Sequence, residues 1–394
     1  MTVAALIECV ANARAAGGEP LALALIDLAE AEPLLGHRQA IVRPLLTEAA
    51  ALLDTGGRPA LEGRVLLRLA HVKLSEADLE GTAQLVKRAR DRFDNVASGD
   101  AHWRVLDCQA LLARTAIRRN DLAAATTMLT ELGVGADDRD EAETVDARRA
   151  VAHLVLGWAE LAIEQRDYAG ADKRLDVLAA GLEGDDELSE QRFACQQTRA
   201  AVALAQGMLE RGCHALREVV SIAKRTGSVE DELEMRIALA GTLVERDDLV
   251  SREEAERHLQ ITRDSAQEHG LDSLHMAALI GQAGVFAKKG QTHAALDRCI
   301  EIANSAVAKQ DLPRYGAAVA LMSQIYEQKG DLASAYRTFA DANARLRETL
   351  GDVSKDVIRP HLAAFADRIG REKFQEIAEQ VTRAAHAAKD FRRL

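Results

Sequence analysis

Residues 317–342 read AAVALMSQIYEQKGDLASAYRTFADA, a segment that predicts two helices joined by a short turn. Gly330 can adopt the left-handed conformation that ends a helix, and Asp331 can cap the next one. Ala335 and Phe339 lie one helical turn apart, so they share one face of the second helix. The segment is therefore a helix–turn–helix unit with small residues where its two helices approach closely.

The same pattern recurs along the chain at intervals of about 40 residues. A small residue in a first helix is followed, about twelve places later, by a small residue in a second helix. The first-helix residues are Ala70, Ala113, Ala159, Ala203, Gly241, Ala283 and Ser323, and their partners are Thr82, Ala125, Ala171, Ala215, Ala255, Ala295 and Ala335. Such a period is typical of stacked supersecondary units, so it predicts an all-α solenoid.

The unit at 317–342 resembles the tetratricopeptide repeat (TPR). That family has a small residue, an aromatic residue three places later, a Gly-Asp turn, and then an alanine, an aromatic residue and a second alanine. Here these positions are Ser323, Tyr326, Gly330-Asp331, Ala335, Phe339 and Ala342. The resemblance covers roughly residues 3–350 and implies a right-handed α-solenoid of TPR-like repeats. The spacing of 38–46 residues exceeds the usual 34, which resembles the long-repeat type of bacterial regulators.

The pattern divides the chain into three expected parts. Residues 1–55 are expected to form N-terminal TPR-like helices, and residues 56–350 a central array of about seven repeats. Residues 351–394 are expected to form C-terminal capping helices followed by a basic tail. A solenoid end needs such a cover because its last repeat would otherwise expose its apolar face.

Composition excludes several classes of function. A formal net charge of −12 argues against nucleic acid as the direct partner, because phosphate binding needs a basic surface. The five cysteines are scattered without a CxxC pair, which favours buried, reduced thiols in a cytoplasmic protein. The first residues carry no basic segment, and no apolar run approaches 18 residues, so we expect neither a signal peptide nor membrane insertion.

No catalytic motif is present, and we expect neither enzymatic activity nor a cofactor or metal ion. The sequence lacks a phosphate-binding loop, a GxSxG elbow and an HExxH motif. Two weak alternatives remain, namely a thiol or metal site at Cys213-His214 and an acid–base pair at Glu160 and Glu164. The acidic clusters at residues 137–140 and 184–187 lack the spacing of a calcium loop.

The TPR resemblance implies a concave groove lined by the first helices, which would bind a peptide segment or helix of another protein. Its exposed positions follow each small first-helix residue by one place and by about five places. They are His71, Arg114, Arg118, Glu160, Glu164, Leu204, Met208, Thr242, Arg246, Lys288, Gln324 and Gln328. We expect this groove to be basic near Arg114 and acidic near Glu160.

The main functional hypothesis is therefore a non-catalytic scaffold or adaptor that binds a protein partner. The alternative is a TPR signalling receptor that responds to a peptide or small ligand. Self-association is also open, because the ends of a solenoid can stack.

Overall fold

The computed structural model describes residues 3–31, 39–53, 57–96, 99–132, 144–246, 248–350 and 354–391. Within these ranges the chain forms nineteen α-helices and one 3₁₀ turn, and no strand. None of these helices is both long and apolar enough to cross a bilayer. The prediction of an all-α repeat fold is confirmed.

The chain forms two compact units, residues 1–235 and 236–394, and the boundary falls within α12 (Val229–Glu245). Unit 1 contains α1 (Val3–Ala16), α2 (Gly18–Ala31), α3 (Gln39–Leu53), α4 (Pro59–Ser75), α5 (Leu79–Phe93), α6 (Gly99–Arg118), α7 (Leu122–Leu132), α8 (Val145–Glu164), α9 (Tyr168–Gly181), the 3₁₀ turn Asp186–Leu188, α10 (Ser189–Ala205) and α11 (Leu209–Thr226). Unit 2 contains α13 (Leu249–Glu268), α14 (Asp272–Lys288), α15 (Thr292–Ala308), α16 (Leu312–Gln328), α17 (Leu332–Leu350), α18 (Ser354–Ile369) and α19 (Arg371–Phe391).

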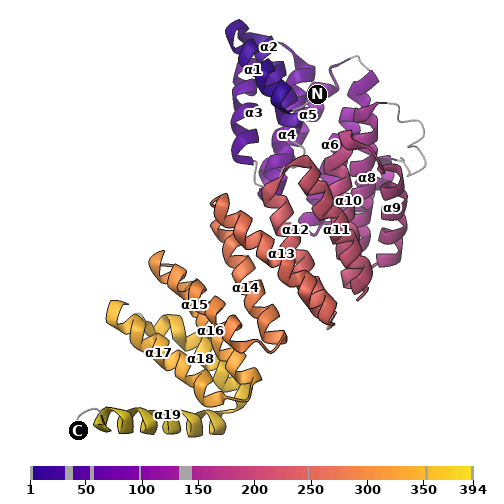
Figure 1. Cartoon of the computed structure of the whole chain (residues 1–394). Helices are drawn as coiled ribbons and strands as arrows, with labels where there is room; N and C mark the ends of the chain where they lie inside the picture. Colours follow the sequence, from indigo (N-terminus) through magenta and orange to yellow (C-terminus); the bar gives the residue numbers. More distant parts are fainter. Residues whose placement is uncertain are drawn as a thin grey trace. The chain divides into compact units, whose positions relative to one another are not determined.

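Within each unit, successive helices pack against one another as hairpins (Figure 1). In unit 1 the first helices of the hairpins also contact each other in the order α4, α6, α8, α10, and α2 of the N-terminal pair contacts α4. These helices form one layer, and α5, α7, α9 and α11 pack on them as second helices. A side chain on one first helix can therefore meet side chains that lie a whole repeat away in the sequence.

The hairpin turns have a common chemistry that the sequence predicts at residues 330–331. Gly330 has a φ of 76°, and the Asp331 carboxylate accepts a hydrogen bond of 3.0 Å from the Ser334 amide. The turn before α9 has the same form, with Arg166 at a φ of 61° and Asp167 as the helix cap. Each turn thus ends one helix and caps the next within two residues.

The small residues predicted at the helix contacts are buried, with one exception. Six of the seven first-helix positions and all seven partners are buried, and several have no exposed area. Gly241 is exposed, and its neighbour Ala240 is buried instead. The predicted alignment of this repeat is therefore wrong by one residue. The connection between α12 and α13 has three residues, as in the other hairpins, so the longer turn expected here is not present.

Helices lie near both ends of the described chain. The N-terminal pair is α1 and α2, which meet at Gly17 and Gly18, two glycines with positive φ. At the other end α18 packs on α16 and α17, and α19 packs on α17. The ring centroids of Phe339 on α17 and Phe365 on α18 lie 5.8 Å apart, so α18 continues the apolar core of unit 2, and a capping role for the last helices stays a prediction.

Candidate functional site

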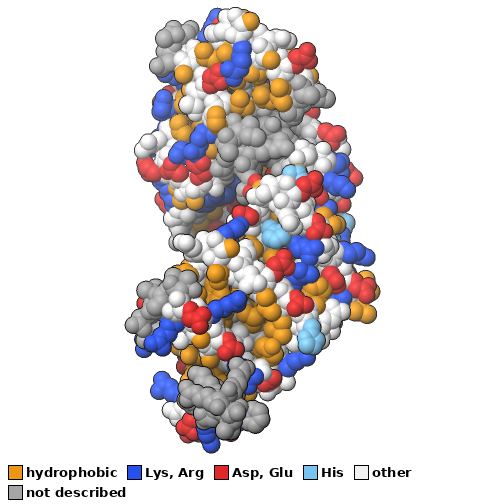
Figure 2. All heavy atoms as spheres, turned by 60° about the vertical axis from the view of Figure 1, so that its left-hand side comes forward, with side chains coloured by type: hydrophobic (Ala, Val, Ile, Leu, Met, Phe, Trp, Pro, Cys, Tyr) orange, Lys and Arg blue, Asp and Glu red, His pale blue; other side chains and the backbone are white. Residues whose placement is uncertain are grey.

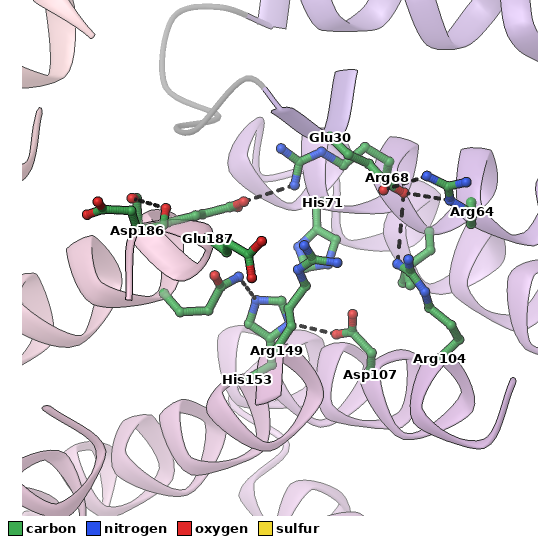
Figure 3. Close-up of a pocket in the computed structure, with 14 residues that line it drawn as sticks. Glu30, Arg64, Arg68, His71, Arg104, Asp107, Arg149, His153, Asp186 and Glu187 are labelled. Carbon is green, nitrogen blue, oxygen red and sulfur yellow. Dashed lines mark hydrogen bonds and ion pairs between the residues drawn. The ribbon is translucent and has the colours of Figure 1, made fainter. Parts of the chain in front are cut away.

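Unit 1 contains a cavity of about 390 Å³ lined mainly by charged and polar side chains (Figure 3). The lining comes from α2, α4, α6, α8, the 3₁₀ turn and the start of α10. Its charged, imidazole and amide members are Glu30, Arg64, Arg68, His71, Arg104, Asp107, Arg149, His153, Asp186, Glu187, Glu190 and Gln191. Four guanidinium groups and five carboxylates thus line one partly open space, and two of the carboxylates, Asp186 and Glu187, are largely exposed to solvent.

Helical spacing explains how so many side chains reach the cavity. On α4, Arg64, Arg68 and His71 lie four and three residues apart, so they share one face of the helix. Asp107 on α6 and His153 on α8 occupy the same repeat position as Arg64, six residues before the small residue of their helix. Because α4 and α6 are neighbours, as are α6 and α8, these equivalent positions lie side by side at the same level along the helix axes.

Asp107, His153 and Gln191 form a buried hydrogen-bonded chain. Nδ1 of His153 lies 2.6 Å from Oδ1 of Asp107, and Nε2 of His153 lies 3.0 Å from the side-chain amide nitrogen of Gln191. Burial alone would raise the pKa of Asp107, but the charge of His153 and its hydrogen bond outweigh burial and keep that pKa below its usual range. The carboxylate is therefore ionised, and the His153 ring is held through both nitrogens.

His71 lies beside this chain, with its ring centroid 5.1 Å from that of His153. It is only 9% exposed, and among the described residues it has no hydrogen-bond partner. Burial, followed by the charge of His153, lowers the pKa of His71 to about 3, although Asp107 and Glu190 oppose the change. His71 is therefore a neutral imidazole at physiological pH.

Each guanidinium group at the cavity has a carboxylate partner. The pairs are Arg64 with Asp27 and Glu30 at 2.8 Å each, Arg68 with Glu190 at 3.0 Å, Arg104 with Asp146 at 2.8 Å and Arg149 with Asp146 at 2.9 Å. Burial opposes ionisation of Glu30, but the hydrogen bond and charge of Arg64 outweigh it and lower the pKa of Glu30 to about 2. The cavity is thus a compensated set of buried charges.

The predicted groove residues of unit 1 do not form separate basic and acidic patches. Arg114 and Glu160 occupy equivalent positions on α6 and α8 and pair with each other at 2.7 Å. Arg118 donates a hydrogen bond of 2.9 Å to the Leu74 carbonyl. The expectation of a basic region followed by an acidic one is therefore wrong, because the opposite charges lie close enough to pair.

The predicted exposure of the groove holds for some residues only. Six of the predicted residues are exposed, namely Arg118, Glu164, Met208, Lys288, Gln324 and Gln328. Four are half-buried, namely Arg114, Glu160, Leu204 and Arg246. The remaining two, His71 and Thr242, are buried. His71 was expected in an open groove, and it lies in the cavity instead. The positions of Thr242 and Arg246 are predicted by counting from Gly241, so both are wrong by the same one residue. The residue before Arg246, Glu245, is the one that pairs across the repeats, with Lys288 at 3.2 Å.

The two alternative chemical sites are not assembled. Cys213 is buried while His214 is exposed, so their side chains lie in different environments. Glu160 is engaged by Arg114 and does not face Glu164 as an acid–base pair. The acidic cluster at 184–187 does contribute to the cavity, whereas the cluster at 137–140 lies outside the described residues. On the face shown in Figure 2, acidic and basic side chains are interspersed.

No protein-family model and no curated protein matches this chain. Its structure is similar to that of a signal transduction ATPase with numerous domains (STAND) protein with a tetratricopeptide repeat sensor from Pyrococcus horikoshii, with a TM-score of 0.53 and 13% identity over 90% of this chain. The chain has a TPR-type helical repeat fold. This TPR-type chain spans 54% of the length of the Pyrococcus protein, and the similarity concerns the fold alone.

Two further structures are similar at lower scores. The apo form of RapI has a TM-score of 0.45 and 14% identity, covering 73% of this TPR-type chain and 99% of its own. Aspartyl phosphate phosphatase F from Bacillus subtilis has a TM-score of 0.43 and 13% identity, covering 86% of this chain and 91% of its own.

Proposed function

We propose that this TPR-type chain binds a protein partner by taking a charged peptide segment of that partner into the cavity of unit 1. The observation that carries the proposal is the cavity itself, where neighbouring first helices direct charges of both signs into one space of about 390 Å³. A segment with both acidic and basic side chains would be recognised by the opposite charges of this lining.

Stacking of the repeats does not by itself require charged residues at the cavity, although the ion pairs present there add to the contacts between helices. The contacts between the helices are already made by buried alanines such as Ala113, Ala125 and Ala159. Burying ion pairs rarely adds stability over apolar residues of the same volume, because each charge loses its hydration. A concentration of such pairs around one space is therefore a candidate binding site.

We propose binding without catalysis. A triad-type reaction would need Nε2 of His153 to face a nucleophile. That nitrogen is instead 3.0 Å from the Gln191 amide, and the Ser189 hydroxyl donates to the Asp186 carbonyl at 2.6 Å. The acidic composition supports a protein over nucleic acid as the partner. Location in the cytoplasm and self-association through the repeat ends stay predictions.

A charge exchange at Arg68 and Glu190 tests the proposal. The double variant Arg68→Glu with Glu190→Arg retains an ion pair between α4 and α10, but reverses the charge that a ligand meets on each side. Partners captured from a native lysate by the wild-type chain are identified by mass spectrometry. The affinity of the recovered peptide is then measured for both chains. We expect at least about tenfold weaker binding in the double variant.

The matched control exchanges the exposed pair Arg119 and Glu80 in the same unit, 2.7 Å apart and away from the cavity lining. This control is expected to bind as the wild type does. Equal affinity of the Arg68/Glu190 exchange and the wild-type chain, with both folded, would place binding outside the cavity and refute the proposal.

The size of the cavity also favours a second candidate, a receptor for a small charged ligand. Pockets for small molecules typically measure about 300–1,000 Å³, and this cavity lies within that range. A panel of dicarboxylates, amino acids and short charged peptides can be tested for a rise in melting temperature and for compaction in small-angle scattering. A response to a free small molecule that the charge exchange abolishes supports the receptor, and no response across the panel counts against it.

A further inference from the structure

Three buried side chains at the cavity meet from three successive first helices. His71 on α4, Asp107 on α6 and His153 on α8 each offer one ligand atom, and these atoms all lie within 4.8 Å of one another. We propose that this cluster binds a divalent first-row transition metal ion of the zinc class through two imidazole nitrogens and one carboxylate oxygen. This inference goes beyond partner binding and does not depend on it.

The ligand types fit such an ion. Two imidazoles and one carboxylate form a common three-ligand set for zinc and related ions. Zinc–ligand distances of about 2.0–2.2 Å place the ligand atoms of a tetrahedral site about 3.3 Å apart. The three atoms lie within 4.8 Å of one another, so we infer that small movements of the side chains would bring them around one ion.

His71 supplies the second, independent observation. Its side chain is more than nine-tenths buried, faces the cavity, and has no hydrogen-bond partner among the residues that the structure describes (Figure 3). A ring nitrogen that lines a cavity and has no protein partner can take a ligand there. A metal–nitrogen bond would satisfy this imidazole, and the neutral ring is the form that binds metals.

The other two residues are already held together as ligands of an empty site would be. The 2.6 Å hydrogen bond between Asp107 and His153 keeps carboxylate and imidazole adjacent, and an ion bound between them would take the place of its proton. Gln191 contacts the same ring at Nε2. With the ion on Nδ1, the proton of the neutral ring lies on Nε2, and the Gln191 side-chain oxygen, after rotation of the amide, would accept it and fix the ring's orientation. The adjacent cavity leaves room for water in the open coordination position.

The charge balance of the cavity tolerates a dication. Guanidinium groups of Arg68, Arg104 and Arg149 line the same space, but Arg68 is paired with Glu190, and the other two with Asp146. Five carboxylates and four guanidinium groups line the space. An ion at the cluster therefore enters a region that is negative overall.

Titration of the full chain with zinc tests the proposal. The protein is freed of metal with a chelator, exchanged into buffer and titrated with Zn²⁺ in a calorimeter, and Co²⁺ absorption is recorded in parallel. We expect one Zn²⁺ per chain. The variants His71→Asn and Asp107→Asn are expected to weaken zinc binding at least about 100-fold. Loss of a residue that only hydrogen-bonds to a metal ligand already lowers metal affinity by up to about 100-fold, and these two residues are ligands themselves.

His214→Asn is the matched control, because His214 is an exposed histidine of the same unit. It should bind zinc as the wild type does. Circular dichroism establishes that each variant is folded, and Asp107→Asn carries the test if His71→Asn is not. No stoichiometric zinc binding by the wild-type chain, or equal binding by the folded cluster variants, would overturn the proposal.

The same variants separate this inference from the proposed function. Partner capture in chelator-containing buffer tests the cavity without metal. Loss of zinc binding in His71→Asn with partner capture retained supports the metal site while leaving the peptide site intact. Zinc binding retained in the Arg68/Glu190 exchange, with the partner lost, supports both proposals as separate properties.

Discussion

Replacing Glu30 with Gln would remove one buried charge from the cavity while preserving the shape of the side chain. Glu30 on α2 is 18% exposed and accepts hydrogen bonds from Arg64 on α4 through both oxygens, at 3.1 and 2.8 Å. These bonds join the N-terminal hairpin to the first helix of the next repeat. The variant therefore tests whether the charges at the cavity also hold unit 1 together.

The pKa of Glu30 sets the size of the effect. Lowering that pKa from 4.5 to about 2 corresponds to about 3 kcal/mol of stabilisation at neutral pH. Because the folded-state pKa is depressed, this stabilisation is fully present above pH 4.5 and is lost as the pH falls toward 2. In the variant, Arg64 would keep its ion pair with Asp27 at 2.8 Å, so its charge would not be left without a partner. We therefore expect Glu30→Gln to lower the free energy of unfolding by about 2–3 kcal/mol at pH 7.

The assay uses the two tryptophans of the chain, Trp103 and Trp158, which both lie in unit 1. Urea unfolding followed by tryptophan fluorescence therefore reports unit 1 alone. Wild type and variant are compared at pH 7, 5 and 3, and their difference should shrink as the pH falls. The control Glu80→Gln, at an exposed carboxylate, should leave the midpoint unchanged. An equal loss of stability at pH 7 and pH 3 would refute the electrostatic explanation.

Three further predictions follow from packing and exposure. Gly63→Ala places a new methyl group 2.6 Å from the Phe93 ring, so we expect a loss of about 1–3 kcal/mol in urea unfolding, where a gain would show that the ring yields. Brief labelling of the native chain with a thiol reagent should modify one cysteine, Cys9, because the other four are buried; mass spectrometry counts the labels, and a second fast label would contradict the burial. A double-mutant cycle of Arg114→Ala and Glu160→Ala should give a coupling free energy of at least about 0.5 kcal/mol, and additive effects would mean that the 2.7 Å pair contributes nothing.

Local features of the sequence were sufficient for the repeat architecture. The turn at Gly330 and Asp331 could be predicted because a left-handed glycine and a capping aspartate act within a few residues. Burial of Ala113 and Ala159 followed from the period, since every repeat places its small residue at the same contact. The exception at Gly241 shows the limit, because the repeat period does not fix the rotation of a helix to within one residue, and Ala240 is the buried residue there.

The cavity could not be predicted in this way. His71, Asp107 and His153 come from three different repeats, and no local pattern links them. One signal was available, since Arg64, Asp107 and His153 are polar residues at equivalent positions of three successive first helices. That signal gives neither distance nor partner, because the rotation of each helix against its neighbours decides which side chains meet.

The sequence by itself determined the helices, their turns and the small residues between them, because these depend on interactions within about one repeat. Only the tertiary structure decided that Arg114 pairs with Glu160 and that two histidines and an aspartate share one buried space. Such contacts join residues that are a full repeat apart. They depend on the packing of one helix against the next, which a one-dimensional pattern does not contain.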